Sequence, residues 1–294
     1  MKLTKIKVGY LISYDFEYFF TSVKYVYKFV DEIFLAIDKE GLTWSGTPFK
    51  IADDFFIRLN KLDVDNKIKI YRDIFYKPEL TPIQLDTRER EMLNVKMGRG
   101  WKIQLDSDEY IYDFQKIAQY FKKYWYFTVF PSQTPLMLQG RLISMIKGDE
   151  SGFYYVDNNE PFVFATNQNQ FSTARLNYNI RNFNINAICV HQSWARTKPE
   201  LQFKINNWGH VNDFDKEGYL YLWDSIGYTN YKEFKNFHPT SPLAWPKIQF
   251  MPAKSIEDFI SVFEKTRRQK LKPIPLRTIF GAGFRKAIRL LRKK

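Results

Sequence analysis

Four apolar segments, separated by amphipathic stretches of helical length, dominate the first 110 residues and constrain the fold more than any other feature. The first two segments are IKVGYLIS at residues 6–13 and EIFLAID at residues 32–38. Between them, apolar residues recur at helical spacing from Phe16 to Val30. A strand, a helix and a strand within about 35 residues form a βαβ unit, which requires parallel strands and a right-handed crossover.

The alternation of strands and helices continues to the end of this region. Asp15 stands just before the first helix and is predicted to cap it. In the helix expected at 82–97, residues 88–91 are charged and are expected on its exposed side. The sequence therefore predicts an open, doubly wound, mostly parallel α/β sheet. The other elements expected here are a helix at 52–62, a strand at 67–76 and a strand at 101–105.

The pattern changes in the second half of the chain. Residues 114–124 have helical character, whereas residues 125–190 are rich in strand formers and turn residues, with DNNEP at 157–161. This composition indicates that the sheet becomes mixed and more antiparallel after the first 110 residues.

The basic residues are concentrated at the end of the chain. The formal net charge is +13, but twelve of the 45 Lys and Arg residues and none of the 32 Asp and Glu residues lie in residues 265–294. The rest of the chain is close to neutral, with 33 basic against 32 acidic residues. A fold that grips nucleic acid carries basic residues over a whole face, so we expect no nucleic-acid partner.

Signals for export are absent from the sequence. Residues 1–20 contain no long apolar core followed by a small-residue cleavage site, so we expect no secretion signal. No run of about 18 apolar residues predicts a transmembrane helix. Cys189 is the single cysteine, which excludes an intramolecular disulfide and fits a reducing cytoplasm.

The segment WKIQLDSDEY at residues 101–110 runs from an apolar strand directly into Asp106 and Asp108. In an open α/β sheet, ligands bind beyond the carboxyl ends of the strands, near the point where strand order reverses. Side chains two residues apart in an extended segment point the same way, so both carboxylates can meet one cation. Mg²⁺ or Mn²⁺ suits such oxygen ligands. An ordinary turn or helix cap would also place two aspartates here.

These segments resemble nucleotide-sugar glycosyltransferases of the GT-A fold, family 2-like, over roughly residues 5–250. VGYLISYD matches the family's first strand and EIFLAID its second, while the helix TRERE…NVKMGRG leads into the Asp-x-Asp segment as in the family. The resemblance implies a GT-A catalytic domain at 1–250, with a doubly wound, mostly parallel mixed sheet. The resemblance also implies sugar transfer from a nucleotide-sugar donor, with a UDP-sugar preferred. The basic composition of the remaining residues predicts a helical, membrane-associating segment at 251–294.

The resemblance further implies roles for individual residues. His191 follows the apolar run NINAICV, and the pair Arg196–Thr197 with Lys204 downstream matches a pattern found near the end of some GT-A domains. An imidazole can complete a metal site, and a cation beside a departing diphosphate stabilises its charge. The implied metal ligands for Mn²⁺ or Mg²⁺ are Asp106, Asp108 and His191, and the implied donor-binding residues are Tyr14, Asp38, Arg196 and Lys204.

No residue stands out as the catalytic base. Asp213, in WGHVNDFD, and Glu160, in DNNEP, are candidates for deprotonating an acceptor hydroxyl. A solvated loop after the preceding helix is the plainer explanation for Asp213. The sequence therefore leaves the stereochemistry of transfer open.

The C-terminal segment has a pattern of its own. Residues 276–292 place apolar residues at i, i+3, i+4 and i+7 with basic residues on the other faces. This pattern is typical of an amphipathic helix in an anionic membrane interface, where each basic residue contributes about 1 kcal/mol. The segment LKPIP at 271–275 is expected to be a short stiff linker to the body. A helix that docks on the body or on a partner subunit is the alternative.

Together these features predict a cytoplasmic hexosyltransferase, peripherally associated with the inner face of the cell membrane. Its expected acceptor is a glycan of bacterial surface polysaccharide synthesis, with a lipid-linked glycan as the first candidate. Two other functions stay open. A nucleotidyltransferase also places aspartate pairs beside a doubly wound sheet, although LISYDFEYF at 11–19 lacks the glycine-rich phosphate loop. A non-catalytic carbohydrate-binding scaffold would keep the fold without the chemistry.

Overall fold

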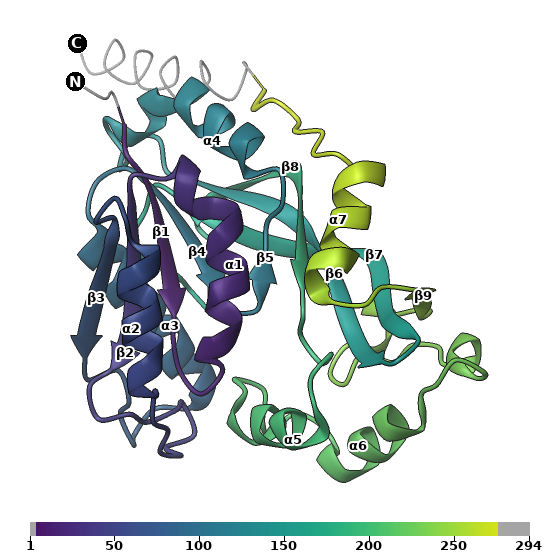
Figure 1. Ribbon diagram of the computed structural model, residues 1–294. Coiled ribbons are helices and arrows are strands. Elements are labelled where there is room, and N and C mark those ends of the chain that lie inside the picture. The colour runs from purple at the N-terminus through teal and green to yellow at the C-terminus, as the bar shows by residue number, and fades with distance from the viewer. Residues whose placement is uncertain (1–3, 276–294) are drawn as a thin grey trace.

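A computed structural model describes residues 4–275 of the chain (Figure 1). Within these residues, nine strands form one mixed sheet in the order β3-β2-β1-β4-β7-β6-β8-β5, and β9 pairs with β7. The strands are β1 (Ile6–Leu11), β2 (Glu32–Asp38), β3 (Ile68–Asp73), β4 (Trp101–Asp106), β5 (Glu109–Tyr110), β6 (Leu136–Asp149), β7 (Gly152–Thr166), β8 (Arg181–His191) and β9 (Gln249–Met251). The prediction of a mixed α/β sheet is confirmed.

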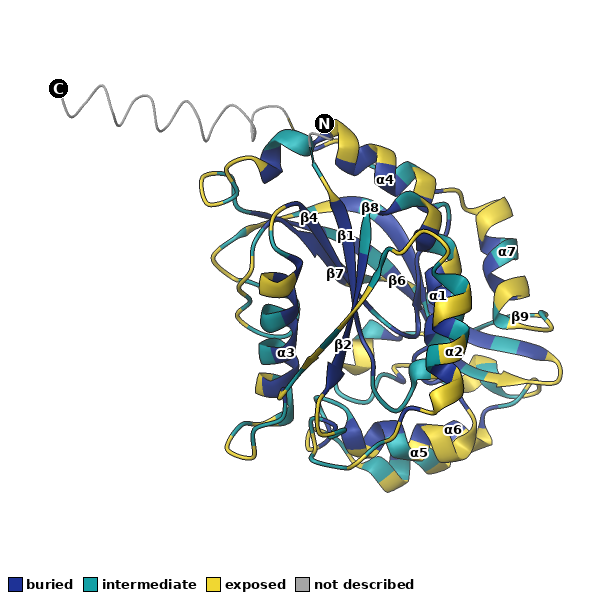
Figure 2. Ribbon diagram, turned by 60° about the vertical axis from the view of Figure 1, so that its left-hand side comes forward, coloured by how far each residue is buried: buried dark blue, intermediate teal, exposed yellow. Residues whose placement is uncertain are grey.

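Helices cover both faces of the parallel part of the sheet. Figures 1 and 2 show α1 and α2 on one face and α3 on the other, with α5 and α6 beyond one end. The α-helices are α1 (Phe19–Val26), α2 (Asp53–Leu62), α3 (Pro82–Met97), α4 (Phe114–Lys123), α5 (Lys198–Asn207), α6 (Lys216–Ser225) and α7 (Ile256–Thr266). Short 3-10 helices are η1 (Phe16–Tyr18), η2 (Tyr27–Phe29), η3 (Trp125–Thr128), η4 (Tyr231–Glu233) and η5 (Pro242–Ala244).

The strand order reverses between β1 and β4. From β1 the chain moves outward through β2 to β3 and then returns to place β4 on the other side of β1, with all three pairings parallel. Leu11 at the end of β1 is in register with Asp106 at the end of β4. The loops after these two strands therefore meet at the position where open α/β sheets bind ligands.

The first predicted helix is divided into three parts. The stretch from Phe16 to Phe29 forms η1, α1 and η2 rather than one regular helix. Asp15 occupies the N-cap position, but its side chain makes no capping hydrogen bond. It contacts Arg196 instead, 3.0 Å away, so the prediction of Asp15 as a side-chain cap is wrong. An ion pair with a distant residue has taken the place of the local bond.

Helix α3 packs closely on β1. It begins at Pro82 after a capping box, in which Thr81 and Gln84 satisfy each other's backbone groups. A Cβ at Gly9 would come within 2.7 Å of Leu93, so the glycine permits this close approach. The expected exposure of the charged residues in α3 is wrong for two of them. Glu89 and Arg90 are only 7% and 3% exposed, because their side of α3 faces the carboxyl ends of the strands.

The second half of the sheet is more antiparallel, as predicted. β6 and β7 form a long antiparallel hairpin, and β8 returns parallel to β6. The two-residue strand β5 pairs antiparallel with the end of β8, placing Glu109 opposite His191. This pairing brings the segment just after the Asp-x-Asp motif next to the histidine that ends β8.

Residues 252–275 pack on the body of the protein. Helix α7 buries Phe259, Ile260 and Phe263 against side chains of β5, β6, β7 and β8. The segment 271–275, predicted to be a short stiff linker that separates the C-terminal segment from the body, is docked: Ile274 is buried in the main core and its backbone N–H donates to the hydroxyl of Tyr124. That part of the prediction is wrong because Ile274 finds an apolar site beside α4.

The predicted amphipathic helix at 276–292 lies outside the described residues. Among residues 4–275, none of the helices combines the length and the apolar character that crossing a membrane requires.

Candidate functional site

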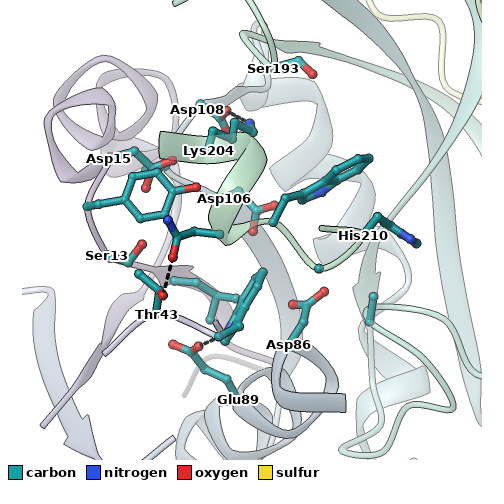
Figure 3. Close-up of a pocket in the computed structure, with 18 of the residues that line it drawn as sticks. Ser13, Asp15, Thr43, Asp86, Glu89, Asp106, Asp108, Ser193, Lys204 and His210 are labelled. Atoms are coloured by element: carbon teal, nitrogen blue, oxygen red, sulfur yellow. Dashed lines mark hydrogen bonds and ion pairs between the residues drawn. The ribbon is translucent and has the colours of Figure 1, made fainter. Parts of the chain in front are cut away.

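A cavity of about 270 Å³ lies at the carboxyl ends of β1, β2 and β4. The loop after β2, helix α3, the end of β8 and helix α5 form much of its wall (Figure 3), and β7, the loop before β8 and the segments after α5 contribute the rest. The predicted residues among its lining are Tyr14, Asp38, Asp106, Asp108, Glu160, His191 and Lys204. Arg196 and Asp213 are not part of the lining, but Arg196 contacts the lining residues Asp15, Asp108 and Ser193.

Asp108 is held by three basic side chains. Its Oδ2 lies 2.5 Å from Arg196 Nη2 and 2.9 Å from Lys204 Nζ, and its Oδ1 lies 3.5 Å from His191 Nε2. Burial alone would raise the pKa of this carboxyl, but the charges of Lys204, His191 and Arg196 outweigh burial and hold the pKa well below its usual range. Asp108 is therefore a carboxylate in the folded protein.

Asp106 is oriented by cations from two other elements. Its Oδ1 accepts a hydrogen bond from Arg90 Nη2 at 2.8 Å, and its Oδ2 lies 3.8 Å from Arg175 Nη2. Burial opposes ionisation, yet Arg90 and Arg175 lower the pKa of Asp106 below its ordinary value. Arg175 is itself fixed by two hydrogen bonds of 2.6 Å to Glu109.

Lys204 of α5 reaches the cavity because of how that helix begins. Thr197 and Glu200 form a capping box, and a proline stands in the first turn. Two turns later, Lys204 points at Asp108, with 8% of the residue exposed. At the end of the helix, Asn207 accepts a hydrogen bond of 2.7 Å from Thr43, which lies in the loop after β2.

The arrangement of Asp106, Asp108 and His191 fits a divalent cation whose remaining ligands come from a bound substrate. One oxygen of Asp106 and one of Asp108 is engaged by Arg or Lys, while the second oxygen of Asp106 makes no hydrogen bond with the described residues. His191 Nε2 stands beside the remaining oxygen of Asp108. Within residues 4–275, no three His, Cys, Asp or Glu side chains are arranged as a complete metal centre. Mg²⁺ and Mn²⁺ usually complete their shells with water and phosphate oxygens, so the partial set fits them.

Asp38 anchors two loops. Its Oδ1 accepts backbone N–H groups of Glu40 and Leu42 at 2.9 and 3.1 Å, and its Oδ2 accepts those of Phe75 and Tyr76 at 2.9 and 3.2 Å. A carboxylate offers about four lone-pair positions, and these four bonds occupy them. In this conformation Asp38 shapes the cavity wall and has no acceptor left for a nucleobase.

Tyr14 and the candidate bases Glu160 and Asp213 differ in their position relative to the cavity. The ring of Tyr14 packs 4.8 Å from that of Phe203 on α5, and burial raises the pKa of its hydroxyl. Glu160 on β7 lines the cavity and accepts hydrogen bonds at Oε2 from Ser144 and Trp245. The side chain of Asp213 is 54% exposed and contacts His210 Nδ1 at 2.6 Å.

Several site residues escaped the sequence analysis. Asp15 was expected to be a cap, Glu89 and Arg90 were expected to be exposed, and Arg175 was not singled out. The spacing of α3 contained a usable signal, since residues 86, 89 and 90 lie three and four positions apart and continue the buried stripe of Leu93 and Met97. Nothing local marked Arg175, whose partner Glu109 is 66 residues away.

Comparisons with known proteins add little to this description. No protein-family model matches the chain, and no curated protein matches it. A structure of S. aureus TarS is similar over 47% of this chain and 36% of its own, with 14% identity and a TM-score of 0.29. A mannose-6-phosphate isomerase from Helicobacter pylori is similar over 51% of this chain and 55% of its own, with 17% identity and a TM-score of 0.30. The chain thus spans less than two thirds of either structure, and similarities this low assign no activity.

Proposed function

We propose that this protein is a metal-dependent glycosyltransferase of GT-A type, which transfers a sugar from a nucleotide-sugar donor to a glycan acceptor. One observation carries the proposal. Asp106 and Asp108 lie at the reversal point of strand order, line the cavity and are kept ionised by cations from α3, α5 and the loops before and after β8. An ordinary surface turn needs no such set of buried partners.

The cations around Asp108 suit a diphosphate. Arg196 and Lys204 are both buried, and each has further N–H donors beyond those that contact Asp108. In a site with little water, a positive group near a leaving diphosphate stabilises the charge that develops on it. We therefore assign donor binding to Arg196 and Lys204, with Tyr14 on the adjoining wall.

Asp106, Asp108 and His191 are the residues that would hold Mn²⁺ or Mg²⁺. Such an ion, when bound, neutralises charge on the diphosphate of the donor. The protein's own contribution is orientation: Arg90 fixes Asp106, and Arg196 and Lys204 fix Asp108, as partners of metal ligands usually do.

Glu160 is the better placed of the two candidate bases. It reaches the cavity, and its Oε1 makes no hydrogen bond with the described residues, so this oxygen can accept a proton from an acceptor hydroxyl. Asp213 lies outside the lining and would act only through His210. A Glu160→Gln variant should keep donor binding and lose transfer.

The acceptor we propose is a glycan, with a lipid-linked glycan at the cytoplasmic face of the membrane as the leading candidate. This part of the proposal rests on the sequence of residues 276–292, whose basic and apolar pattern suits an anionic lipid surface. It is independent of the donor site.

Hydrolysis of a panel of UDP-, GDP-, CMP- and dTDP-sugars, with MnCl₂ or with EDTA, tests the donor proposal. Metal-dependent release of nucleotide from one donor is expected, and Asp106→Ala should abolish it while leaving the circular dichroism spectrum unchanged. Release that survives EDTA would contradict the metal assignment. Silence with every donor, and no thermal stabilisation by any nucleotide with Mn²⁺, would favour a non-catalytic carbohydrate-binding scaffold.

A further inference from the structure

The cavity has two ends of opposite chemical character. Lys204 and Asp108 lie at one end, while Glu89 and Asp86 lie on the other side of Asp106 (Figure 3). Diphosphate oxygens are attracted to the cation Lys204 at the first end, whereas Glu89 and Asp86 offer them no positive charge at the other. A nucleotide that places its diphosphate beside Lys204 therefore has the Glu89 end available for its base.

Glu89 is a buried acid with an unused oxygen. Only 7% of the residue is exposed, yet it lines the cavity. Its Oε2 accepts a hydrogen bond of 2.8 Å from the indole N–H of Trp44, in the loop after β2. Its Oε1 makes no hydrogen bond with the residues that the structure describes. Since Glu89 lines the cavity, this oxygen is available to a ligand that enters it.

The surroundings of Glu89 favour its neutral form. The pKa of Glu89 is raised to about 8, mainly by burial and in the same direction by the nearby carboxylates Asp86 and Asp38, while the Trp44 hydrogen bond and Arg90 act in the opposite direction. These are the charged groups that face Glu89 from α3 and from the end of β2. At neutral pH the side chain is a carboxylic acid, which can donate a hydrogen bond.

We propose that neutral Glu89 donates a hydrogen bond from Oε1 to a carbonyl oxygen of a uracil base, and so selects uridine nucleotides. Trp44 holds the other oxygen as the acceptor, which leaves the proton on Oε1. The inference rests on the proposed donor site, because it assumes that the diphosphate lies at the cationic end.

The neighbouring acid supports uracil over other bases. Asp86 lies one turn before Glu89 on the same side of α3, and its Oδ1 accepts from Arg90 Nε while its Oδ2 makes no hydrogen bond with the described residues. Glu89 offers a hydrogen-bond donor, and beside it Asp86 offers a hydrogen-bond acceptor. This pair matches a base that presents a carbonyl next to an N–H, as uracil does with O4 and N3–H. Cytosine and adenine present an amino group next to a bare ring nitrogen, the reverse pattern. Guanine has the matching pattern on a larger ring.

Binding of UDP in MnCl₂ to the full chain, measured by calorimetry at pH 7, tests the assignment. Glu89→Gln keeps an acceptor for Trp44 and a donor for the base, so its UDP affinity should stay within about threefold of the native value. Glu89→Ala should bind UDP about tenfold more weakly, as expected for one lost buried hydrogen bond. Glu264→Gln, on the exposed side of α7, is the matched control and should bind like the native protein.

The pH dependence separates a neutral acid from a carboxylate. Native affinity for UDP should fall several-fold from pH 7 to pH 9, as Glu89 loses its proton. The affinity of Glu89→Gln for UDP should not fall over this range. The variant also serves as the control for titration of the nucleotide, which would affect both proteins equally. Equal pH profiles for the two proteins would overturn the inference, as would native affinity in the Glu89→Ala variant.

A nucleotide panel completes the test and keeps the two proposals apart. UDP should bind at least about tenfold more tightly than CDP, ADP or GDP to the native protein. Preferential binding of ADP or CDP would contradict a hydrogen bond from Glu89 to a base carbonyl. Preferential binding of GDP would contradict the assignment of uracil as the base. If no nucleotide binds at all, the donor-site proposal fails. If UDP binds tightly and Glu89→Ala does not weaken its binding, the role of Glu89 is contradicted and the donor-site proposal stands.

Discussion

The guanidinium of Arg196 lies 2.5 Å from the carboxylate of Asp108, and the same Nη2 atom lies 3.0 Å from Asp15. One cation thus joins the segments that follow β1, β4 and β8. All three side chains are largely buried, with Arg196 only 1% exposed. This contact couples the stability of the fold to the geometry of the proposed donor site.

Replacing Asp108 by Asn should destabilise the protein and remove activity together. Removing the charge leaves Lys204 buried without a carboxylate partner and Arg196 with Asp15 alone, which we expect to cost about 3 kcal/mol in the free energy of unfolding. Donor hydrolysis should fall about a hundredfold or more. Denaturant unfolding and a nucleotide-release assay measure the two effects. The exposed partner in the Lys198–Asp224 pair provides the control, and Asp224→Asn should change neither.

The cost of that substitution should depend on pH. The folded-state pKa of Asp108 is held well below its usual range, chiefly by Lys204, His191 and Arg196 against the effect of burial. The stability it contributes is therefore complete above the ordinary value of about 3.9 and is lost as pH falls toward the folded-state value. The difference between the native protein and Asp108→Asn should be full at pH 7 and shrink below pH 4.

His191→Ala tests the third proposed metal ligand. We expect the affinity for Mn²⁺ in the presence of nucleotide to fall roughly 10- to 100-fold, with little change in thermal stability, because the imidazole stands beside Asp108 without a close hydrogen bond. Thermal shift against a MnCl₂ titration measures this affinity. His210→Ala, at the cavity rim, should retain it. An unchanged Mn²⁺ titration in His191→Ala would remove the histidine from the site.

Glu89→Gln should stabilise the folded protein more at high pH than at low pH. The folded-state pKa is about 8, mainly because of burial, whereas an unfolded Glu titrates near 4.3. Between these values the folded state holds a proton that the unfolded state has released, so native stability falls with rising pH by up to about 1.4 kcal/mol per pH unit. Glutamine carries no such proton. Guanidinium unfolding at pH 4.5, 6 and 8 should show a growing advantage for the variant.

Gln269→Ala tests whether the segment after α7 is part of the fold. The buried amide of Gln269 donates to the carbonyls of Tyr112 and Ile188, and its oxygen accepts the N–H of Ile188. Losing these bonds leaves buried backbone groups unpaired and should cost about 2 to 3 kcal/mol. Gln115→Ala, on the exposed side of α4, should leave stability unchanged. Limited proteolysis near residue 270 should be faster only in the first variant.

The proposed membrane contact is tested on the full chain. Replacing Arg285, Lys286, Arg289 and Arg292 by Gln removes about 4 kcal/mol of attraction to an anionic surface, close to a thousandfold in partitioning. Sedimentation with phosphatidylglycerol vesicles should show the loss, and pure phosphatidylcholine vesicles should bind neither protein well. If the variant binds the phosphatidylglycerol vesicles as well as the native protein does, the membrane role is contradicted. Docking on the body or on a partner subunit would then be the role of this segment.

Local patterns anticipated the elements of the first half closely. The strands at 6–11, 32–38 and 101–106 appear where the apolar runs placed them, because parallel strands covered by helices are buried on both faces. Helix α3 also lies at the predicted position. The failures share one cause. Asp15, Glu89 and Ile274 were each predicted from their local sequence, but in the structure each contacts residues that are distant in sequence.

The sequence by itself determined the order of strands and helices, the parallel start of the sheet and the position of Asp106 and Asp108 at a strand end, because hydrophobic periodicity and chain connectivity are local properties. Only the tertiary structure decided which charges meet. Asp108 finds Arg196 and Lys204 across 88 and 96 residues, and Glu89 meets Trp44 across 45. Ion pairing and pKa values depend on distances and burial, and these exist only once the chain has folded.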